Sequence, residues 1–380
     1  MKLHSIEPTP SPNTMKLNID EKATQAKTYT PDHLEDAPEI IRQLLQIEGV
    51  KSVFRVADFI SVERNPRADW KEILSGVREV FGLDENEHNH RQPVDSISTE
   101  AFGEVKVYLQ TFRGIPIQLK LSRDDEEKRV ALPERFSEAV MEAQKASPNM
   151  VMERRWEELG VRYGELDELG QEVTEEISAS YDPKRLENLV QQALLQESDS
   201  PAPERRPKMK VTLDMLDHPD WKKRYALLEQ MNPTLDDLDV LDKALNDPKP
   251  MIRRLATAYL GMIGDAKVLP SLYRALKDPS VTVRRTAGDC LSDIGDPDAI
   301  GPMIESLKDK SKLVRWRAAM FLYETGDESA LPALREAQAD PEFEVSMQVK
   351  MALERIERGE EASGSVWKQM TRRNEGDSDF

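Results

Sequence analysis

Cysteine is nearly absent from this chain of 380 residues, which contains only Cys290. A single thiol allows no internal disulfide and no Cys-x-x-Cys motif, so a disulfide scaffold is excluded. Cys290 falls on the apolar side of a predicted helix. That position favours a small buried core residue over a reactive thiol.

Long apolar runs are also missing. No run approaches the length of a transmembrane helix, and residues 1–6 lack the apolar core of a signal peptide. The net charge of −18 argues against binding to nucleic acid or to an anionic membrane, because both require cations that face phosphate. We therefore expect a cytoplasmic protein with neither of these ligands.

The sequence signatures of catalysis are missing too. The chain has no glycine-rich phosphate loop and no nucleophile elbow. None of its five histidines is followed by glutamate; they are His4, His33, His88, His90 and His218. His88 and His90 lie in a polar stretch, residues 84–98, which we interpret as a linker rather than a metal site. We predict a non-enzymatic protein with no catalytic, cofactor-binding or metal-ligating residues.

What the chain does contain is a repeat. Its markers are Asp217, Asp247, Asp278, Asp309 and Asp340, which recur at equal intervals except that the first interval is one position shorter. Each aspartate is followed by an apolar stripe at helical spacing, then by a turn, then by a second stripe, so each unit predicts a helical hairpin. One hairpin cannot bury its apolar face alone. Stacked hairpins therefore predict an all-α solenoid over residues 210–357.

This array resembles HEAT repeats, in the short form also found in phycobilisome-lyase-like proteins. In that family an aspartate and an arginine six residues later form a hydrogen-bonded ladder between repeats. The matching pairs here are Asp247 with Arg253, Asp278 with Arg284, and Asp309 with Arg315. Lys223 and Ser346 take the place of the arginine in the first and last repeats. Those two units are expected to be end repeats.

A second column predicts a binding face. Seven residues after the aspartates stand Arg224, Arg254, Arg285, Trp316 and Met347. Helix geometry turns this column away from the apolar one, and solenoids bind ligands on such faces. Arginine and tryptophan suit a protein partner with an acidic and apolar surface. The alternative is that the arginines are ordinary solvated residues and that Trp316 packs against the next repeat.

Residues 1–85 have a different pattern. Short alternating stretches predict strands at residues 3–7, 14–19, 50–56 and 59–63, and helical stripes cover residues 38–47 and 70–81. The expected unit is a small α+β domain of order ββαββα.

This unit resembles the N-terminal domain of the Nfu family of iron–sulfur scaffold proteins. The matching segments are residues 7–16 (EPTPSPNTMK), 47–54 (IEGVKSVF), 58–62 (DFISV) and 69–70 (DW). In that family a Cys-x-x-Cys in a separate C-terminal domain holds the cluster, and this chain has no such motif. The resemblance therefore implies the fold without the cluster chemistry, because thiolates hold such clusters.

The middle of the chain, residues 97–196, matches no family that we recognise, and we expect a mixed α+β region. Alternation predicts a hairpin of residues 105–112 and 115–121, whose strands could extend the N-terminal sheet. Helical stripes are predicted after residue 133, and they include Val151 and Trp156. A cluster of acidic residues on one of these helices is interpreted as a solvated face; it comprises Glu165, Asp167, Glu168, Glu172, Glu175 and Glu176. Residues 197–209 predict a proline-rich linker and residues 358–380 an acidic disordered tail.

The domain order, an Nfu-like N-terminus followed by HEAT repeats, resembles the conserved virulence factor C family of Gram-positive bacteria. The resemblance implies a regulatory or supporting role with no defined reaction. Our first interpretation is a scaffold or adaptor for proteins. The alternatives are an accessory factor that recognises iron–sulfur assembly proteins and a HEAT-type, lyase-like modification factor. The missing His-Glu pairs argue against the di-iron hydroxylases found among HEAT proteins.

Overall fold

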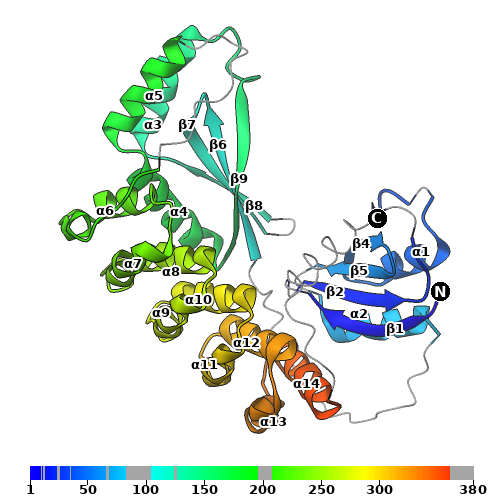
Figure 1. Ribbon diagram of the computed structural model, residues 1–380. Helices are drawn as coiled ribbons and strands as arrows, with labels where there is room; N and C mark the ends of the chain where they lie inside the picture. Colours follow the sequence, from blue (N-terminus) through cyan, green and yellow to red (C-terminus); the bar gives the residue numbers. More distant parts are fainter. Residues whose placement is uncertain are drawn as a thin grey trace, which may run out of the picture. The chain divides into compact units, whose positions relative to one another are not determined.

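The computed structural model describes residues 1–82, 104–195 and 208–359, apart from residues 10, 12, 24–25, 35, 66–67 and 124–125. The chain divides into two compact units, residues 1–103 and 104–380, and each is described by itself (Figure 1). Several predicted segments lie outside the described residues: the polar stretch 84–98 with His88 and His90, most of the proline-rich linker 197–209, and almost all of the acidic tail 358–380.

The first unit is an antiparallel five-stranded sheet with two helices. The strand order is β1-β2-β5-β4-β3. The strands are β1 Leu3–Pro8, β2 Thr14–Ile19, β3 Lys27–Tyr29, β4 Val50–Val56 and β5 Phe59–Arg64, and the helices are α1 Glu39–Gln46 and α2 Trp70–Val80. All the predicted strands and helices are present. The sequence analysis missed β3, whose three residues are too few to show an alternating pattern.

The second unit begins with a sheet of its own. Its strand order is β8-β7-β6-β9, and every neighbouring pair is antiparallel. The strands are β6 Glu104–Phe112, β7 Ile115–Arg123, β8 Glu126–Ala131 and β9 Arg154–Tyr163. The expectation that the β6–β7 hairpin would extend the N-terminal sheet is wrong. The prediction of a helix that included Trp156 is wrong as well, because the segment pairs with β6 along nearly its whole length.

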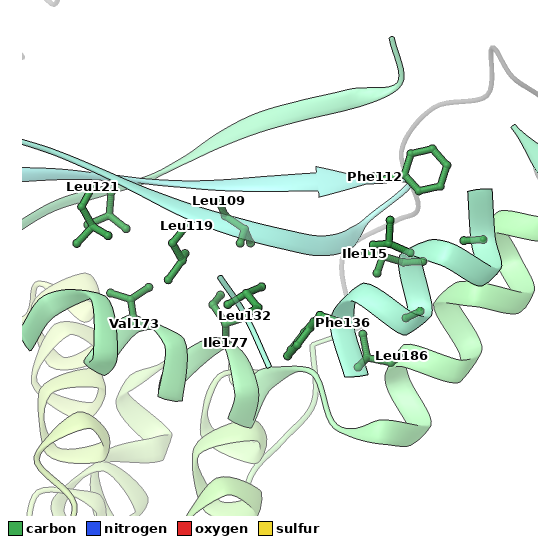
Figure 2. Packing of buried hydrophobic residues seen from close by; sticks show 14 of the residues in the cluster. Leu109, Phe112, Ile115, Leu119, Leu121, Leu132, Phe136, Val173, Ile177 and Leu186 are labelled. Carbon is green, nitrogen blue, oxygen red and sulfur yellow. The ribbon is translucent and has the colours of Figure 1, made fainter. Parts of the chain in front are cut away.

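Three helices cover one face of this sheet. They are α3 Glu134–Ala143, α4 Leu166–Ser180 and α5 Pro183–Leu195. Figure 2 shows Leu109, Leu119 and Leu121 of the strands facing Val173 and Ile177 of α4. Alternate residues of β6 and β7 therefore point into one apolar core, as the period of two predicted.

The rest of the second unit is the helical array. Figure 1 shows the helix pairs stacked one after another. The helices are α6 Trp221–Leu228, α7 Leu238–Ala244, α8 Pro250–Ile263, α9 Leu269–Ala275, α10 Val281–Ile294, α11 Ile300–Ser306, α12 Lys312–Thr325, α13 Leu331–Ala337 and α14 Phe343–Glu357. The predicted fold class is confirmed: an α+β domain, a mixed α+β region and a HEAT-type solenoid.

Small residues let neighbouring repeats approach closely. Ala256, Ala287 and Ala318 are fully buried between the helices. Gly261 of α8 lies against Cys290 of α10, and a Cβ atom at position 261 would come 2.3 Å from its Sγ atom. Cys290 is buried, as predicted, and burial raises the pKa of its thiol.

The ladder joins each repeat to the next. Each arginine binds the aspartate of the following repeat through two nitrogens, at 2.6–3.0 Å; the pairs are Arg253 with Asp278, Arg284 with Asp309, and Arg315 with Asp340. The same guanidinium also donates to main-chain carbonyls that precede its own helix, such as those of Asp247 and Pro248. Bidentate pairing fixes both the distance and the orientation of adjacent hairpins.

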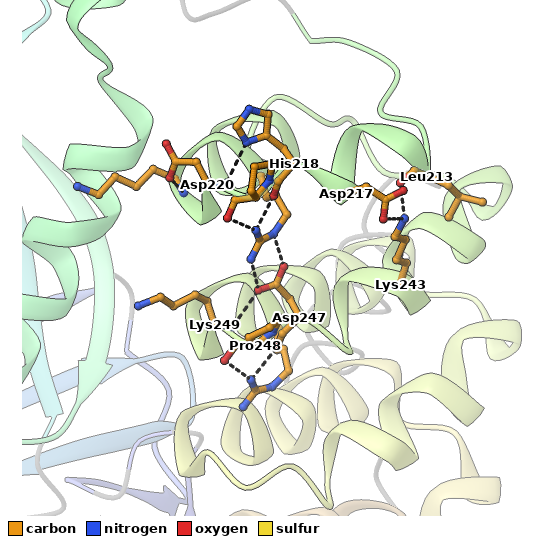
Figure 3. Close-up of polar contacts among 12 residues, drawn as sticks. Leu213, Asp217, His218, Asp220, Lys243, Asp247, Pro248 and Lys249 are labelled. Carbon is orange, nitrogen blue, oxygen red and sulfur yellow. Dashed lines mark hydrogen bonds and ion pairs between the residues drawn. The ribbon is translucent and has the colours of Figure 1, made fainter.

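The first rung differs from the prediction. Arg224, not Lys223, binds the carboxylate of Asp247, with Nε 2.6 Å from Oδ2. Asp247 thus lies between two arginines, one at its carboxylate and one at its carbonyl (Figure 3). The cause is a shift of one position, because α6 begins at the fourth residue after Asp217 whereas α8 begins at the third residue after Asp247.

Candidate functional site

The predicted arginine and tryptophan face is not free for a partner. Arg224, Arg285 and Trp316 are buried, with 8%, 8% and 3% of their surfaces exposed, and Arg254 and Met347 are half-buried. Arg224 belongs to the ladder, and Tyr225 takes its place in the column once the shift in α6 is counted. The alternative of solvated arginines is wrong for the same reason. On this side of the solenoid, α4 contacts Arg254 and β9 contacts Arg285.

Glu176 of α4 is the centre of this contact. Its Oε2 atom lies 2.9 Å from Nη2 of Arg162 on β9, and its Oε1 atom lies 2.6 Å from Nη2 of Arg254 on α8. Burial acts to raise the pKa of Glu176, but the charges of Arg254 and Arg162 outweigh it and hold the pKa below its usual value. The predicted solvated acidic face is therefore wrong at Glu176. One carboxylate joins the sheet to the second repeat.

Arg285 makes the next contact along the same column. Its guanidinium lies over the ring of Tyr163, the last residue of β9. The Tyr163 hydroxyl donates a hydrogen bond of 2.7 Å to Glu104, and burial raises the pKa of this phenol. Asp289 on α10 pairs with Arg317 of the next repeat at 2.7 Å. Charges of both signs thus alternate along the seam between the sheet and the solenoid.

A cavity of about 210 Å³ lies within this seam. Its lining comes from β9, α4, α8, α10 and α12, and consists of Leu159, Val161, Arg162, Tyr163, Leu169, Glu172, Arg254, Val281, Thr282, Arg285, Thr286, Asp289 and Leu313. The hydroxyl of Thr286 donates its hydrogen bond to the carbonyl of Thr282 and not to a side chain that could act as a general base. Among the described ranges, no group of three His, Cys, Asp or Glu side chains is arranged to hold a metal ion.

Glu172 gives the seam a testable pH dependence. Burial, and then the charge of Glu176, raise the pKa of Glu172 above its usual value of 4.5. Well below pH 4.5 the carboxyl is protonated in both the folded and the unfolded state, but as the pH rises through the raised folded-state pKa the folded protein must hold a partly buried charge. We expect Glu172→Gln to raise the urea midpoint at pH 7 and to leave it unchanged at pH 4. An equal shift at both pH values would contradict this assignment.

A second surface was missed by the sequence analysis. Apolar side chains are exposed along β9 and the turn before it, notably Val151 at 68% and Met152 at 80%. Trp156, Leu159 and Val161 extend the strip, so it holds five of the ten exposed large hydrophobic residues in the described ranges. We call Val151, Met152, Trp156, Leu159 and Val161 the β9 strip. The segment was interpreted as a helix, so the sequence analysis did not identify an exposed strand here.

β9 is also an edge strand. Within the described part of the chain its only strand neighbour is β6, so main-chain groups on its other side have no partner strand. Trp156 lies opposite Gln110 of β6, on the sheet face that the helices do not cover. There, Nζ of Lys120 lies 5.1 Å from the centre of the Trp156 ring and 4.7 Å from that of Tyr108. An exposed edge with apolar side chains is a ready template for another strand.

Three protein families match successive parts of the chain. The family described as Virulence factor matches residues 110–190, within the region for which the sequence analysis named no family. Scaffold protein Nfu/NifU N terminal matches residues 3–85. HEAT repeats match residues 209–292 and 271–354. In the described ranges no helix combines the length and the apolar character that a membrane crossing requires.

Relatives match over almost the whole length. An uncharacterized protein of Bacillus subtilis, YpgR, is 61% identical over 373 residues, which are 98% of each chain. Conserved virulence factor C of Staphylococcus saprophyticus is 46% identical over 379 residues, 98% of this chain and 100% of that protein. The Staphylococcus aureus protein SAV1430, whose crystal structure is known, is 43% identical in sequence to the matched part of this chain. The match covers 21% of this chain and 99% of that chain, with a TM-score of 0.20. With identity at this level from end to end, and with all three of its parts matched in order, the chain belongs to the conserved virulence factor C family.

Proposed function

We propose that this protein is a non-enzymatic scaffold that binds another polypeptide along the β9 strip. The observation that carries the proposal is the concentration of exposed apolar side chains on an edge strand. Isolated exposed apolar residues are ordinary on a protein surface, whereas a concentration of them on one segment is typical of an interaction site. The predicted arginine face is not proposed again, because its residues hold the molecule together.

The solenoid supports this surface. Glu176 ties β9, through Arg162, to the second repeat, and the ladder ties that repeat to those that follow. A strand held in this way loses little conformational freedom when it binds, which lowers the entropic cost of association. An extended partner strand is the ligand that suits an open edge, since it satisfies main-chain donors and acceptors and places alternate side chains over the strip.

Photo-crosslinking tests this proposal. A photoreactive amino acid at Met152, in the full chain and in the source cells, is expected to give a discrete protein adduct. The matched control is Met262, which is 70% exposed but lies on α8, away from the strip. Adducts from Met152 and none from Met262 would support the proposal. No adduct from Met152, or the same products from both positions, would contradict it.

A second candidate function is an accessory role in iron–sulfur cluster assembly. The match of residues 3–85 to the N terminus of Nfu/NifU scaffold proteins favours it. Thiolates are the usual cluster ligands, and one buried cysteine cannot supply a set of them. The role would therefore be recognition of assembly proteins rather than cluster carriage. Assembly proteins among the crosslinked products would favour this candidate over a general scaffold. A supporting role in virulence is likewise proposed from the names of the relatives alone.

A further inference from the structure

We propose that the partner of the β9 strip is a second copy of this chain, whose β9 pairs antiparallel with the first about a two-fold axis at Trp156. The two four-stranded sheets would then form one continuous sheet of eight strands. This inference rests on the proposed function, because it uses the same edge strand and names its occupant.

The charges of β9 are self-complementary in this arrangement. The strand reads Arg154-Arg155-Trp156-Glu157-Glu158, two positive residues, a tryptophan and two negative residues. When two such strands run antiparallel with Trp156 opposite Trp156, Arg154 faces Glu158 of the other copy and Arg155 faces Glu157. The two-fold axis repeats both contacts, which gives four ion pairs. Isologous contacts require this kind of self-complementarity.

The charged side chains are available for these contacts. All four are exposed, and none of them forms an ion pair with any other residue in the described ranges. Glu157 accepts one hydrogen bond, from the hydroxyl of Thr111 at 3.1 Å, and retains its second carboxylate oxygen. By contrast, Arg162 farther along the same strand is already paired inside the molecule. The four charged side chains around Trp156 therefore have no ion-pair partner in the described ranges.

The side chains also lie on the correct faces. Trp156 lies opposite Gln110, on the uncovered face of the sheet, whereas Glu157 lies opposite Leu109, which is buried in the core. Successive residues alternate between faces, so Arg154, Trp156 and Glu158 share the uncovered face. Residues directly opposite in an antiparallel pair also share a face. The uncovered face would then carry a Trp156–Trp156 pair flanked by two ion pairs.

The strand itself limits how far the pairing extends. The register with β6 shifts between Glu158 and Gly160, so Leu159 is an extra residue that bends the strand. Beyond this bulge, Leu159, Val161 and Tyr163 line the cavity beside the solenoid. The regular, open part of the edge is therefore Arg154–Glu158. A short symmetric contact of this kind closes as a dimer, because it uses the same β9 edge of both copies.

Charge reversal in the full chain tests this pairing by sedimentation velocity over a concentration series. The wild-type protein is expected to dimerise, less tightly at high salt. Arg154→Glu with Arg155→Glu, and separately Glu157→Arg with Glu158→Arg, each place like charges opposite one another. Each double variant should weaken the dimer at least about tenfold, since four favourable cross-strand pairs become unfavourable. An equimolar mixture of the two double variants should restore a dimer, because every pair is again of opposite charge.

The variant with all four substitutions provides the matched control. In this variant the negative residues precede Trp156 and the positive residues follow it. It should therefore form homodimers as the wild type does, but it should not exchange subunits with the wild type. A monomeric wild type would overturn the proposal, as would double variants that dimerise normally or a mixture that stays monomeric. If the wild type is monomeric while Met152 still crosslinks to another protein, the inference fails and the proposed function stands. Unchanged thermal unfolding of the variants would show that they remain folded.

Discussion

Replacing Glu176 with glutamine is expected to lower the free energy of unfolding of the second unit by about 3 kcal/mol or more at pH 7, because removing one member of a buried ion pair leaves the other charge uncompensated. Glu176 faces two arginines, Arg162 and Arg254, and only 7% of its side chain is exposed. Glutamine has the same size and still offers one acceptor oxygen, so the change removes charge without opening a cavity. Urea unfolding followed by far-UV circular dichroism measures the loss, since most helices belong to this unit.

The control for this change lies one residue away. Glu175 is half-buried on the same helix and has no ion-pair partner in the described ranges, so Glu175→Gln should have little effect. The pH dependence supplies a second check. Because the folded-state pKa of Glu176 is lowered, its contribution is complete above its usual value of 4.5 and is lost as the pH falls through the folded value. A loss at pH 7 no larger than that of Glu175→Gln would show that the seam does not depend on this carboxylate.

The second large effect is expected in the middle of the ladder. Asp278→Asn removes the charge that binds Arg253 through two nitrogens, at 2.7 and 2.8 Å, in a pair that is about nine-tenths buried. We expect the free energy of unfolding to fall by about 3 kcal/mol, because the charge of Arg253 is left buried without a partner. Repeat arrays are stabilised by contacts between neighbours, so a broken central rung also separates the two halves. The urea transition should therefore become broader as well as shift to lower concentration.

Asp217→Asn is the matched control, since it changes the equivalent aspartate of the first repeat. Its partner is Lys243, and 70% of the Asp217 side chain is exposed. Exposed ion pairs contribute little to stability, so Asp217→Asn should lower the free energy of unfolding by less than about 1 kcal/mol. Equal destabilisation by the two substitutions would mean that burial does not determine the strength of the ladder.

The solenoid and the N-terminal unit were largely predictable because their signals are local. The regular period of the aspartates, the helix starts that follow them and the apolar stripes all act within one hairpin or between adjacent hairpins. The error at Lys223 was also local. The interval from Asp217 to Asp247 is one position shorter than the later intervals, and the shift at the start of α6 moves the arginine to Arg224.

β9 was mistaken for a helix because an edge strand with one strand neighbour need not show apolar alternation. Its first six residues are all exposed, so no burial pattern marks the strand in the sequence. What makes it a strand is its pairing with β6, from which β7, β8 and α3 separate it along the chain. The candidate interaction surface was missed with it.

The sequence by itself determined the repeat, the ladder aspartates, the Nfu-like domain and the side of each helix that faces its own core. Only the tertiary structure decided which segments pack against the opposite side of those helices. Arg254 and Arg285 were correctly placed off the apolar column, yet they are covered by α4 and β9 instead of facing solvent. The physical reason is distance along the chain: Glu176 and Arg254 are 78 residues apart. Helical periodicity reports the direction in which a side chain points, and it carries no information about which distant segment meets that side chain.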